Sequence, residues 1–160
     1  MRYVNDNAVG KYSSFIVDPV QVRFYSGSEA EGKLTTEQLS ELTDYMHSKL
    51  VEAIQAAGKT VVDQPAEGVA RVRAALSDIN KASALTILPQ ANLLGAGVGG
   101  ASMEAEVVDS MTGVQIGAVV QSGTGSRIPF TNLGDLSSAK NVINGWAKRF
   151  QERLVGTNAK

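Results

Sequence analysis

The chain has 160 residues, with 15 Lys and Arg against 16 Asp and Glu, which leaves a formal net charge of −1. Hydrophobic residues make up 43% of the sequence and charged residues 19%, so a single domain with a sizeable core is expected. The balanced charge disfavours a dedicated nucleic-acid function, because neutralising phosphates requires clustered Lys and Arg in excess. The absence of Cys excludes disulfides, a thiolate nucleophile and Cys-ligated metal sites. The single histidine, His47, leaves no pair for a His-rich metal site, and we expect no cofactor.

The first structured segment, residues 12–25, is rich in β-branched and aromatic residues that alternate with period two, which predicts a long strand. Phe15 and Val17 share one parity, whereas Val22 has the other. Proline cannot donate to a ladder, and one inserted residue reverses the facing of every later side chain. We therefore expect a bulge or an edge kink at Pro19.

Residues 36–57 predict the main helix of the domain. The Thr35 hydroxyl can cap its first turn, Gln38 completes a capping box, and Leu34 with Leu39 can form a hydrophobic staple. A helix of this length can cross a whole sheet, so we expect it to cover one. Its apolar positions recur in steps of three and four and form one buried stripe: Leu39, Leu42, Met46, Leu50, Ala53, Ile54 and Ala57.

The segment after this helix contains two expected strands. Residues 59–63 predict a short strand, whereas residues 69–80 fit a strand and a helix about equally, because Val72 and Leu76 belong to both patterns. We favour a strand over residues 69–80, since a hairpin from Thr60 to Leu76 would give the long helix more sheet to cover.

The last part of the chain contains a predicted hairpin and a second helix. Two alternating runs, residues 103–107 and 114–121, flank a glycine-containing turn and predict an antiparallel pair. Residues 136–155 predict a helix whose apolar face includes Trp146 and Phe150. These two aromatic side chains are expected to pack on the sheet rather than to anchor a partner.

The order of elements is therefore strand, helix, two strands, loop, two strands and helix. This order predicts an α+β two-layer sandwich, in which a mostly antiparallel sheet of about five strands is covered by two long helices. We expect one domain over residues 1–160, with a folded core at 12–155 and flexible termini at 1–11 and 157–160.

Eight of the 16 glycines lie between Gly95 and Gly125, in a part of the chain that is otherwise hard to assign. Gly95, Gly97 and Gly100 match the G-x-G-x-x-G spacing of a dinucleotide fingerprint. That fingerprint also needs a following helix, and here an alternating strand follows. An irregular or close-packed segment is the simpler interpretation, and a ligand contact is the alternative.

Two carboxylates share one face of the strand that begins at Met103. Glu104 and Glu106 are two residues apart, which separates their carboxylates by roughly 6 to 7 Å. This separation resembles a general acid and base pair. However, the face of Met103 is the apolar one, so both carboxylates should be solvated and able to pair with Arg71 and Arg73.

The loop at residues 122–127 and His47 are two further candidates for a functional site. The loop at residues 122–127 offers backbone amides and one cation, Arg127, and could contact an anion, although it lacks the Walker spacing. His47 lies off the apolar stripe of its helix and is expected to be exposed. We predict no catalytic residue and no metal ligand, and the following ligand-binding candidates: Gly95, Gly97, Gly100, Glu104 and Arg127.

Four segments carry a family resemblance: YSSFIVDPV at residues 12–20, MEAE at 103–106, DSMTG at 109–113 and GWAK at 145–148. Together they resemble a family of small bacterial lipoproteins of unknown function, DUF3313. The resemblance implies export and attachment to a membrane through a lipid-modified N-terminal cysteine, which this chain lacks. It implies no established activity and no catalytic residues.

From this resemblance, and because no coherent catalytic set is found, we expect a non-enzymatic domain of the cell envelope. It would contact other envelope proteins or copies of itself, and it would reach the membrane only through the lipid anchor. The expected location is the periplasm or outer membrane of a Gram-negative bacterium, with the cytoplasm as the alternative. The rival function is a small-ligand binder or hydrolase that uses residues 95–100 and Glu104, and a cytosolic assembly subunit is a third possibility.

Overall fold

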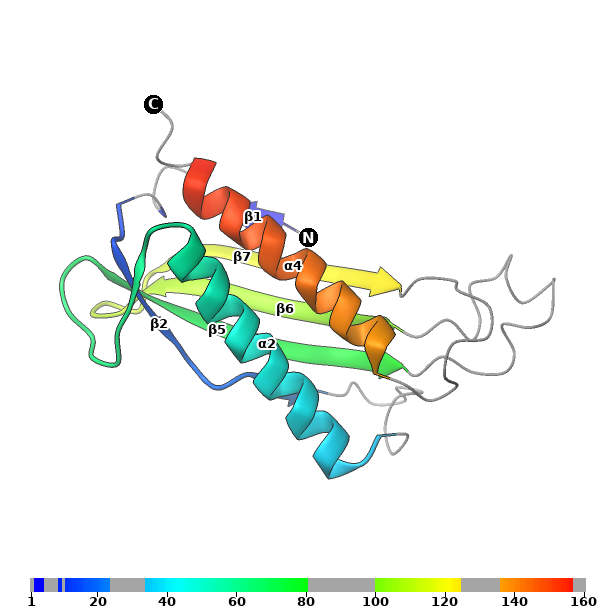
Figure 1. The fold of residues 1–160 in the computed structure, drawn as a ribbon. Helices are drawn as coiled ribbons and strands as arrows, with labels where there is room; N and C mark the ends of the chain where they lie inside the picture. The colour runs from blue at the N-terminus through cyan, green and yellow to red at the C-terminus, as the bar shows by residue number, and fades with distance from the viewer. Residues whose placement is uncertain are drawn as a thin grey trace, which may run out of the picture.

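The computed structural model describes residues 2–4, 9, 11–23, 34–80, 100–124 and 136–156, and these form an α+β arrangement (Figure 1). The expected class and the two long helices are confirmed. The helices are α2 (Thr36–Ala56) and α4 (Ser137–Gly156). The strands are β1 (Arg2–Val4), β2 (Ser14–Val17), β3 (Gln21–Arg23), β4 (Thr60–Val61), β5 (Val69–Asn80), β6 (Gly100–Asp109) and β7 (Gln115–Thr124).

Within these residues, seven strands form one mixed sheet in the order β1-β7-β6-β5-β2-β4, and β3 also pairs with β5. The pairs β1–β7, β7–β6 and β6–β5 are antiparallel, whereas β2 and β3 run parallel to β5, and β4 runs parallel to β2. The sheet therefore has more strands than the five expected, and it is mixed rather than mostly antiparallel. β1 also extends the sheet to residues 2–4, where the sequence predicts a flexible terminus, while residues 157–160 lie outside the described ranges.

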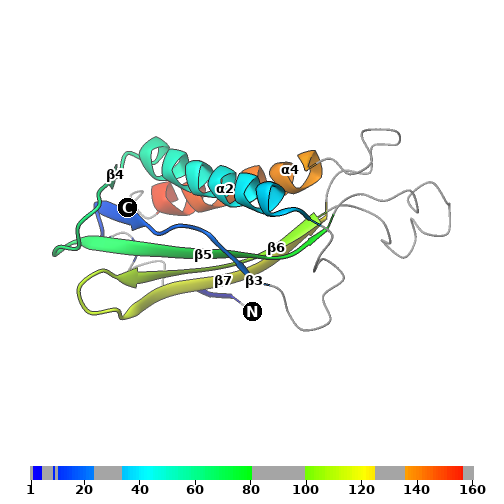
Figure 2. The ribbon, with the colours of Figure 1, turned by 90° about the horizontal axis from the view of Figure 1, so that it is seen from below.

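Both helices lie side by side on one face of the sheet (Figure 2). Among the described elements, no helix covers the other face. The core fills the space between the helices and the sheet, where Phe15, Leu42, Leu76 and Ile143 are at most 1% exposed. The sheet therefore has an apolar face toward the helices and an open face, and this difference positions the candidate site.

The predicted hairpin from Thr60 to Leu76 is wrong, although the choice of a strand over residues 69–80 is confirmed. β4 and β5 lie on opposite sides of β2, and both run parallel to it. α2 returns the chain to the start of β2, so β4 runs parallel to β2, and residues 62–68 then carry the chain past β2 to its other side, where β5 starts at the same level, since Ser14 pairs with both Thr60 and Val69. The crossover through α2 makes β4 parallel to β2, and the pair β4–β5 cannot form a hairpin because β2 lies between them.

The start of α2 agrees with the predicted capping box. Gln38 donates its backbone N–H to the Thr35 hydroxyl at 3.3 Å, and the Thr35 backbone N–H donates to the Gln38 side chain at 3.1 Å. These two bonds satisfy donors that the first turn of a helix leaves without intrahelical partners. The predicted stripe is the buried face, with Leu42, Met46 and Leu50 at its centre.

A one-residue insertion separates β2 from β3, as the change of parity predicts. Val17 pairs with Val72 and Gln21 pairs with Ala75, so four steps along the first strand oppose three steps along β5. Both segments consequently turn apolar side chains toward the helices, including Val17 before the insertion and Val22 after it. The insertion also changes which polar residues reach the open face.

The β6–β7 hairpin is confirmed, and its turn is closed by Asp109. One carboxylate oxygen of Asp109 accepts backbone N–H bonds from Met111 at 3.0 Å and Thr112 at 2.8 Å, and a bond from the Thr112 hydroxyl at 2.9 Å. Gly113 has a φ of 71°, which a glycine adopts without the steric cost of a Cβ. The turn is therefore built by its own side chains.

Candidate functional site

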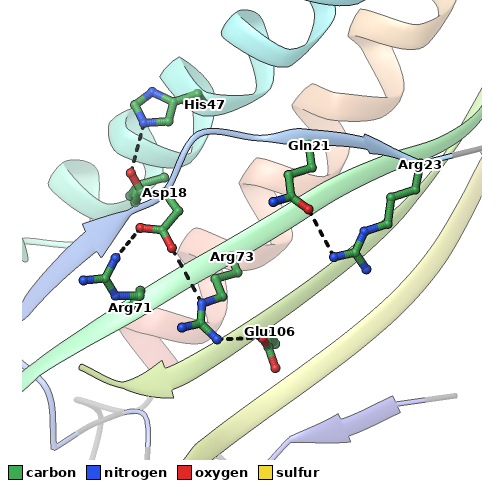
Figure 3. A network of polar contacts seen from close by, with 8 residues as sticks. Asp18, Gln21, Arg23, His47, Arg71, Arg73 and Glu106 are labelled. Carbon is green, nitrogen blue, oxygen red and sulfur yellow. Dashed lines mark hydrogen bonds and ion pairs between the residues drawn. The ribbon is translucent and has the colours of Figure 1, made fainter. Parts of the chain in front are cut away.

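The open face of the sheet holds a groove of about 400 Å³. It is lined by β3, β5, β6 and β7 and by the residues that join β2 to β3. Figure 3 shows the side chains that meet there, with Asp18 beside the two arginines of β5 and Arg23 on the neighbouring strand. We treat this groove as the candidate functional site, because chemically active side chains converge in it.

The register of β5 and β6 places the charges of the groove. Arg73 pairs across the strands with Glu106, and Ala75 pairs with Glu104. Alternation turns these positions to the open face, while Met103 on β6 turns to the core. The small side chain at position 75 leaves space above the sheet between the longer residues.

Asp18 and Glu106 are bridged by Arg73 (Figure 3). The Arg73 Nε lies 3.6 Å from a carboxylate oxygen of Asp18, and its Nη1 lies 3.3 Å from Glu106. Arg71 Nη1 donates to the other Asp18 oxygen at 2.5 Å, and the Gln115 side chain donates to Glu106 at 3.0 Å. Asp18, Arg71, Arg73 and Glu106 therefore form one continuous network, which runs over the open face from the residues after β2, across β5, to β6.

Glu104 belongs to a second, smaller cluster in the same groove. Arg23 Nη1 lies 3.4 Å from the Glu104 carboxylate, and Arg23 also donates to the Gln21 side chain at 3.2 Å. The side chain of Arg23 is 58% exposed and that of Glu104 is 24% exposed. Ion pairs at this exposure typically contribute no more than about 1 kcal/mol each, so the groove adds little to folding stability.

The structure brings together only part of the predicted set. The shared face of Glu104 and Glu106 and the pairing of Arg73 with Glu106 are confirmed. Arg71 pairs with Asp18 instead of a glutamate of β6. Gly100 begins β6, and ligand binding by this residue and by Glu104 stays a prediction. Three candidates lie outside the described residues: Gly95, Gly97 and Arg127.

The residues that sequence reasoning missed are Asp18, Gln21 and Arg23. The sequence feature that points to them is the parity change at Pro19. It indicates an inserted residue, but it does not show which strand pairs with the segment after it. Because β3 runs parallel to β5, Gln21 and Arg23 reach the groove at the level of Ala75 and Ser77.

His47 is half-buried, in contrast to the exposed position expected from its place on the helix. Its Nε2 lies 3.2 Å from the carbonyl oxygen of Val17, which makes the ring nitrogen a donor to the end of β2 (Figure 3). This contact ties α2 to the strand just before the insertion. The role of His47 in the described structure is therefore to hold β2 in place.

A second polar contact of long range joins the start of β2 to the β6–β7 turn. The Tyr12 hydroxyl donates to Asp109 at 2.9 Å. The backbone N–H of Thr112, followed by the Tyr12 hydroxyl, holds the pKa of Asp109 below its usual value. Partial burial, followed by the hydrogen bond to Asp109, raises the pKa of Tyr12.

In the described ranges, no group of three or more His, Cys, Asp or Glu side chains is arranged to hold a metal ion. The same residues contain no helix that combines the length and the apolar character needed to cross a membrane.

Comparison with known proteins places the chain in a family. Residues 1–150 match the family described as Protein of unknown function, DUF3313. The chain belongs to DUF3313. This membership confirms the family that the four sequence segments indicate. No curated protein matches this DUF3313 chain.

Several solved structures are similar to this DUF3313 chain at low sequence identity, and those with a TM-score above 0.5 share its fold. PelC from Paraburkholderia phytofirmans, described as a dodecamer, has a TM-score of 0.52 and 12% identity over 90% of this chain and 88% of that chain. A Xanthomonas campestris protein of the DUF330 family has a TM-score of 0.51 and 11% identity, over 91% of this chain and 85% of that chain. A minor lipoprotein from Acinetobacter baumannii has a TM-score of 0.47 and 9% identity, over 92% of this chain and 95% of that chain.

Proposed function

We propose that this DUF3313 chain is a non-enzymatic, lipid-anchored module of the bacterial envelope, and that it associates with copies of itself through the open face of its sheet. The observation that carries the proposal is the groove on that face, which is lined by two cations, Arg23 and Arg73, and three anions, Asp18, Glu104 and Glu106. Arg71, which is not part of the lining, pairs with Asp18 and completes three charges of each sign. The charges of this face balance, so the surface is suited to a second surface of the same kind rather than to a strongly charged partner.

The character of the open face supports a protein contact. Antiparallel sheets can leave one face in water, but this face also carries apolar side chains on β7 beside the ion pairs. Val120 is 52% exposed and lines the groove beside Ala118. Val120 pairs across the strands with Glu104, so an exposed apolar side chain lies beside the charges of the groove, and protein interfaces combine apolar and polar groups in this way.

The shared fold also supports self-association. PelC has this fold and is described as a dodecamer. The similarity to PelC shows the fold alone, so the surface that joins copies of this chain is proposed from its own residues. We include contact with other envelope proteins in the same proposal, and these proteins would bind this chain at the same groove.

A matched pair of exposed valines tests the proposed surface. Val120→Lys places a charge in the groove, whereas Val155→Lys places the same charge on α4, where Val155 is 46% exposed. Sedimentation velocity should show that Val120→Lys lowers the average mass of the chain and that Val155→Lys does not. Equal masses for wild type and Val120→Lys would exclude this face as the contact between copies.

The envelope location rests on the family resemblance and needs its own test. Fractionation of the source bacterium with an antibody against the chain should recover the protein with the membrane fraction, and detergent should release it. Recovery in the soluble cytoplasmic fraction would contradict the location and favour a cytosolic assembly subunit.

The groove also favours a second candidate function, which is a small-ligand binder or hydrolase that uses Glu104. Its volume falls in the range of about 300 to 1,000 Å³ that is usual for ligand sites. A ligand that binds only the folded state raises the melting temperature. A thermal-shift screen with nucleotides and sugars, repeated on Glu104→Gln, should reveal such a ligand, and a flat response in wild type would count against this alternative.

A further inference from the structure

The two arginines that line the groove stand out from the open face, whereas its carboxylates are recessed. The side chains of Arg23 and Arg73 are 58% and 52% exposed. The side chains of Asp18, Glu104 and Glu106 are 27%, 24% and 34% exposed, respectively. The open face therefore presents protruding positive charges above negative charges that lie lower.

Each protruding arginine holds its carboxylates through single, long contacts (Figure 3). Arg73 lies 3.6 Å from Asp18 through Nε and 3.3 Å from Glu106 through Nη1, and its Nη2 contacts no acceptor among the described residues. Arg23 lies 3.4 Å from Glu104 through Nη1, and its Nε contacts no acceptor in the same part of the chain. Arginine binds a carboxylate most strongly through two parallel N–H···O bonds. Both guanidinium groups therefore keep donors that a carboxylate of a second molecule can use.

Arg71 provides a comparison on the same strand. It lies two residues before Arg73 and also contacts Asp18, but at 2.5 Å, and its side chain is only 26% exposed. It does not line the groove. Arg71 therefore completes the network of its own chain, whereas Arg73 stands where it can reach another molecule.

We propose that two copies of the chain, meeting at their open faces as the proposed function requires, exchange arginine contacts. Arg23 and Arg73 of each copy donate to the recessed carboxylates of the other. When both copies use the same face, every contact that one makes is made in return by the other. Protruding cations then meet recessed anions in both directions, which is the electrostatic complementarity that selects a partner. A strongly acidic or strongly basic partner would leave the charges of one sign without a counterpart.

Charge reversal on the two sides of the contact tests this exchange. Arg73→Glu alone and Glu106→Arg alone should each associate at least about tenfold more weakly than wild type, because like charges then face each other twice in the symmetric contact. An equimolar mixture of the two variants should recover pairs that contain one copy of each. Sedimentation velocity, with one variant carrying a fluorescent label, measures both results. Recovery in the mixture would also show that both variants are folded, and a mixture that associates no better than its components would overturn the proposal.

A charge reversal on the helix layer is the control. Lys49 and Glu52 form an ion pair at 2.6 Å on α2, which lies on the opposite face of the sheet. Lys49→Glu should therefore associate as wild type does. A loss equal to that of Arg73→Glu would mean that net charge, and not the contact at the open face, controls association, and the proposal would be wrong.

The two arginines of β5 give a matched pair of neutral substitutions. Arg73→Gln should weaken association several-fold and reduce its dependence on salt, since it removes a contact between the copies. Arg71→Gln should leave association close to that of wild type, because Arg71 contacts its own chain. Equal losses for the two variants would show that the network acts through the fold of each chain, which would overturn the exchange of contacts.

These outcomes separate this inference from the proposed function on which it rests. A wild-type chain that stays monomeric at every concentration would contradict both. If wild type associates and Val120→Lys prevents it, but Arg73→Glu associates as well as wild type, the open face is the contact and only the exchange of arginines is wrong.

Discussion

The Tyr12 hydroxyl donates to the Asp109 carboxylate at 2.9 Å, and this bond joins the start of β2 to the β6–β7 turn across 97 positions of sequence. The turn also bonds through its backbone to the first residue of β5, because the Ser110 N–H donates to the Val69 carbonyl at 3.0 Å. Three neighbouring strands are thus tied together at one end of the sheet.

Tyr12→Phe should lower the melting temperature, because it removes only the hydroxyl and leaves Asp109 with one donor fewer. Thermal unfolding followed by circular dichroism measures this shift. The turn itself should survive, since Thr112 and Met111 still donate to Asp109. An unchanged melting temperature would show that the bond between β2 and the turn does not contribute to stability.

The same turn predicts how stability depends on pH. The backbone N–H of Thr112, followed by the Tyr12 hydroxyl, lowers the pKa of Asp109 in the folded state from its ordinary value of 3.8. A lowered pKa means that the folded state binds the proton less readily than the unfolded state, so this stabilisation is present above pH 3.8 and is lost as the pH falls through the folded-state pKa. Asp109→Asn should therefore flatten the acid limb of a plot of melting temperature against pH. An acid limb as steep as that of wild type would contradict the assignment.

Thr35→Ala should lower the free energy of unfolding by about 1 kcal/mol, because it removes the hydroxyl that caps α2. Urea unfolding at constant slope measures this change. Thr36→Ala is the matched control, since Thr36 is exposed and follows the cap. A loss as large for Thr36→Ala as for Thr35→Ala would mean that the capping box is not the cause.

Ile143→Ala should cost about 2 to 5 kcal/mol, the usual range for truncating a buried isoleucine. Ile143 is 1% exposed and packs in the core beneath α4. Val155→Ala on the same helix, where the side chain is 46% exposed, should change stability far less. Similar losses for both variants would show that α4 is not packed on the sheet along the predicted face.

Arg73→Gln should cost no more than about 1 kcal/mol, although it breaks the contacts of Arg73 with both Asp18 and Glu106. The measurement is chemical unfolding at low protein concentration and again in high salt, where the difference from wild type should shrink. A loss of several kcal/mol in the free energy of unfolding would mean that the network supports the fold. Its presence in the groove would then be explained without contact with another molecule.

Local features of the chain were predictable from its sequence. The capping box depends on residues three positions apart, and the facing of Glu104 and Glu106 follows from strand alternation, so both could be predicted without knowledge of the sheet. Which strands pair with each other could not be predicted in this way. Residues 60–61 and 69–80 are correct as strands, but whether they pair with each other depends on β2, which lies between them.

The candidate site was predictable to the same extent. Arg73 and Glu106 meet because two long strands pair in one register, and their patterns reveal the shared face. Asp18 and Arg23 join them only because a one-residue insertion and a parallel pairing bring a separate edge segment alongside β5. A pattern of alternation shows that an insertion exists, but the position of the inserted residues in the sheet is a property of the whole fold.

The central claim is that the chain associates with itself through the open face, and its mass in solution tests this claim most directly. Sedimentation equilibrium over a range of micromolar concentrations should give a mass that is a multiple of the 16.8 kDa of one chain. The multiple should fall toward one when the chain is diluted or when Val120 is replaced by Lys. A mass of 16.8 kDa at every concentration would contradict the claim.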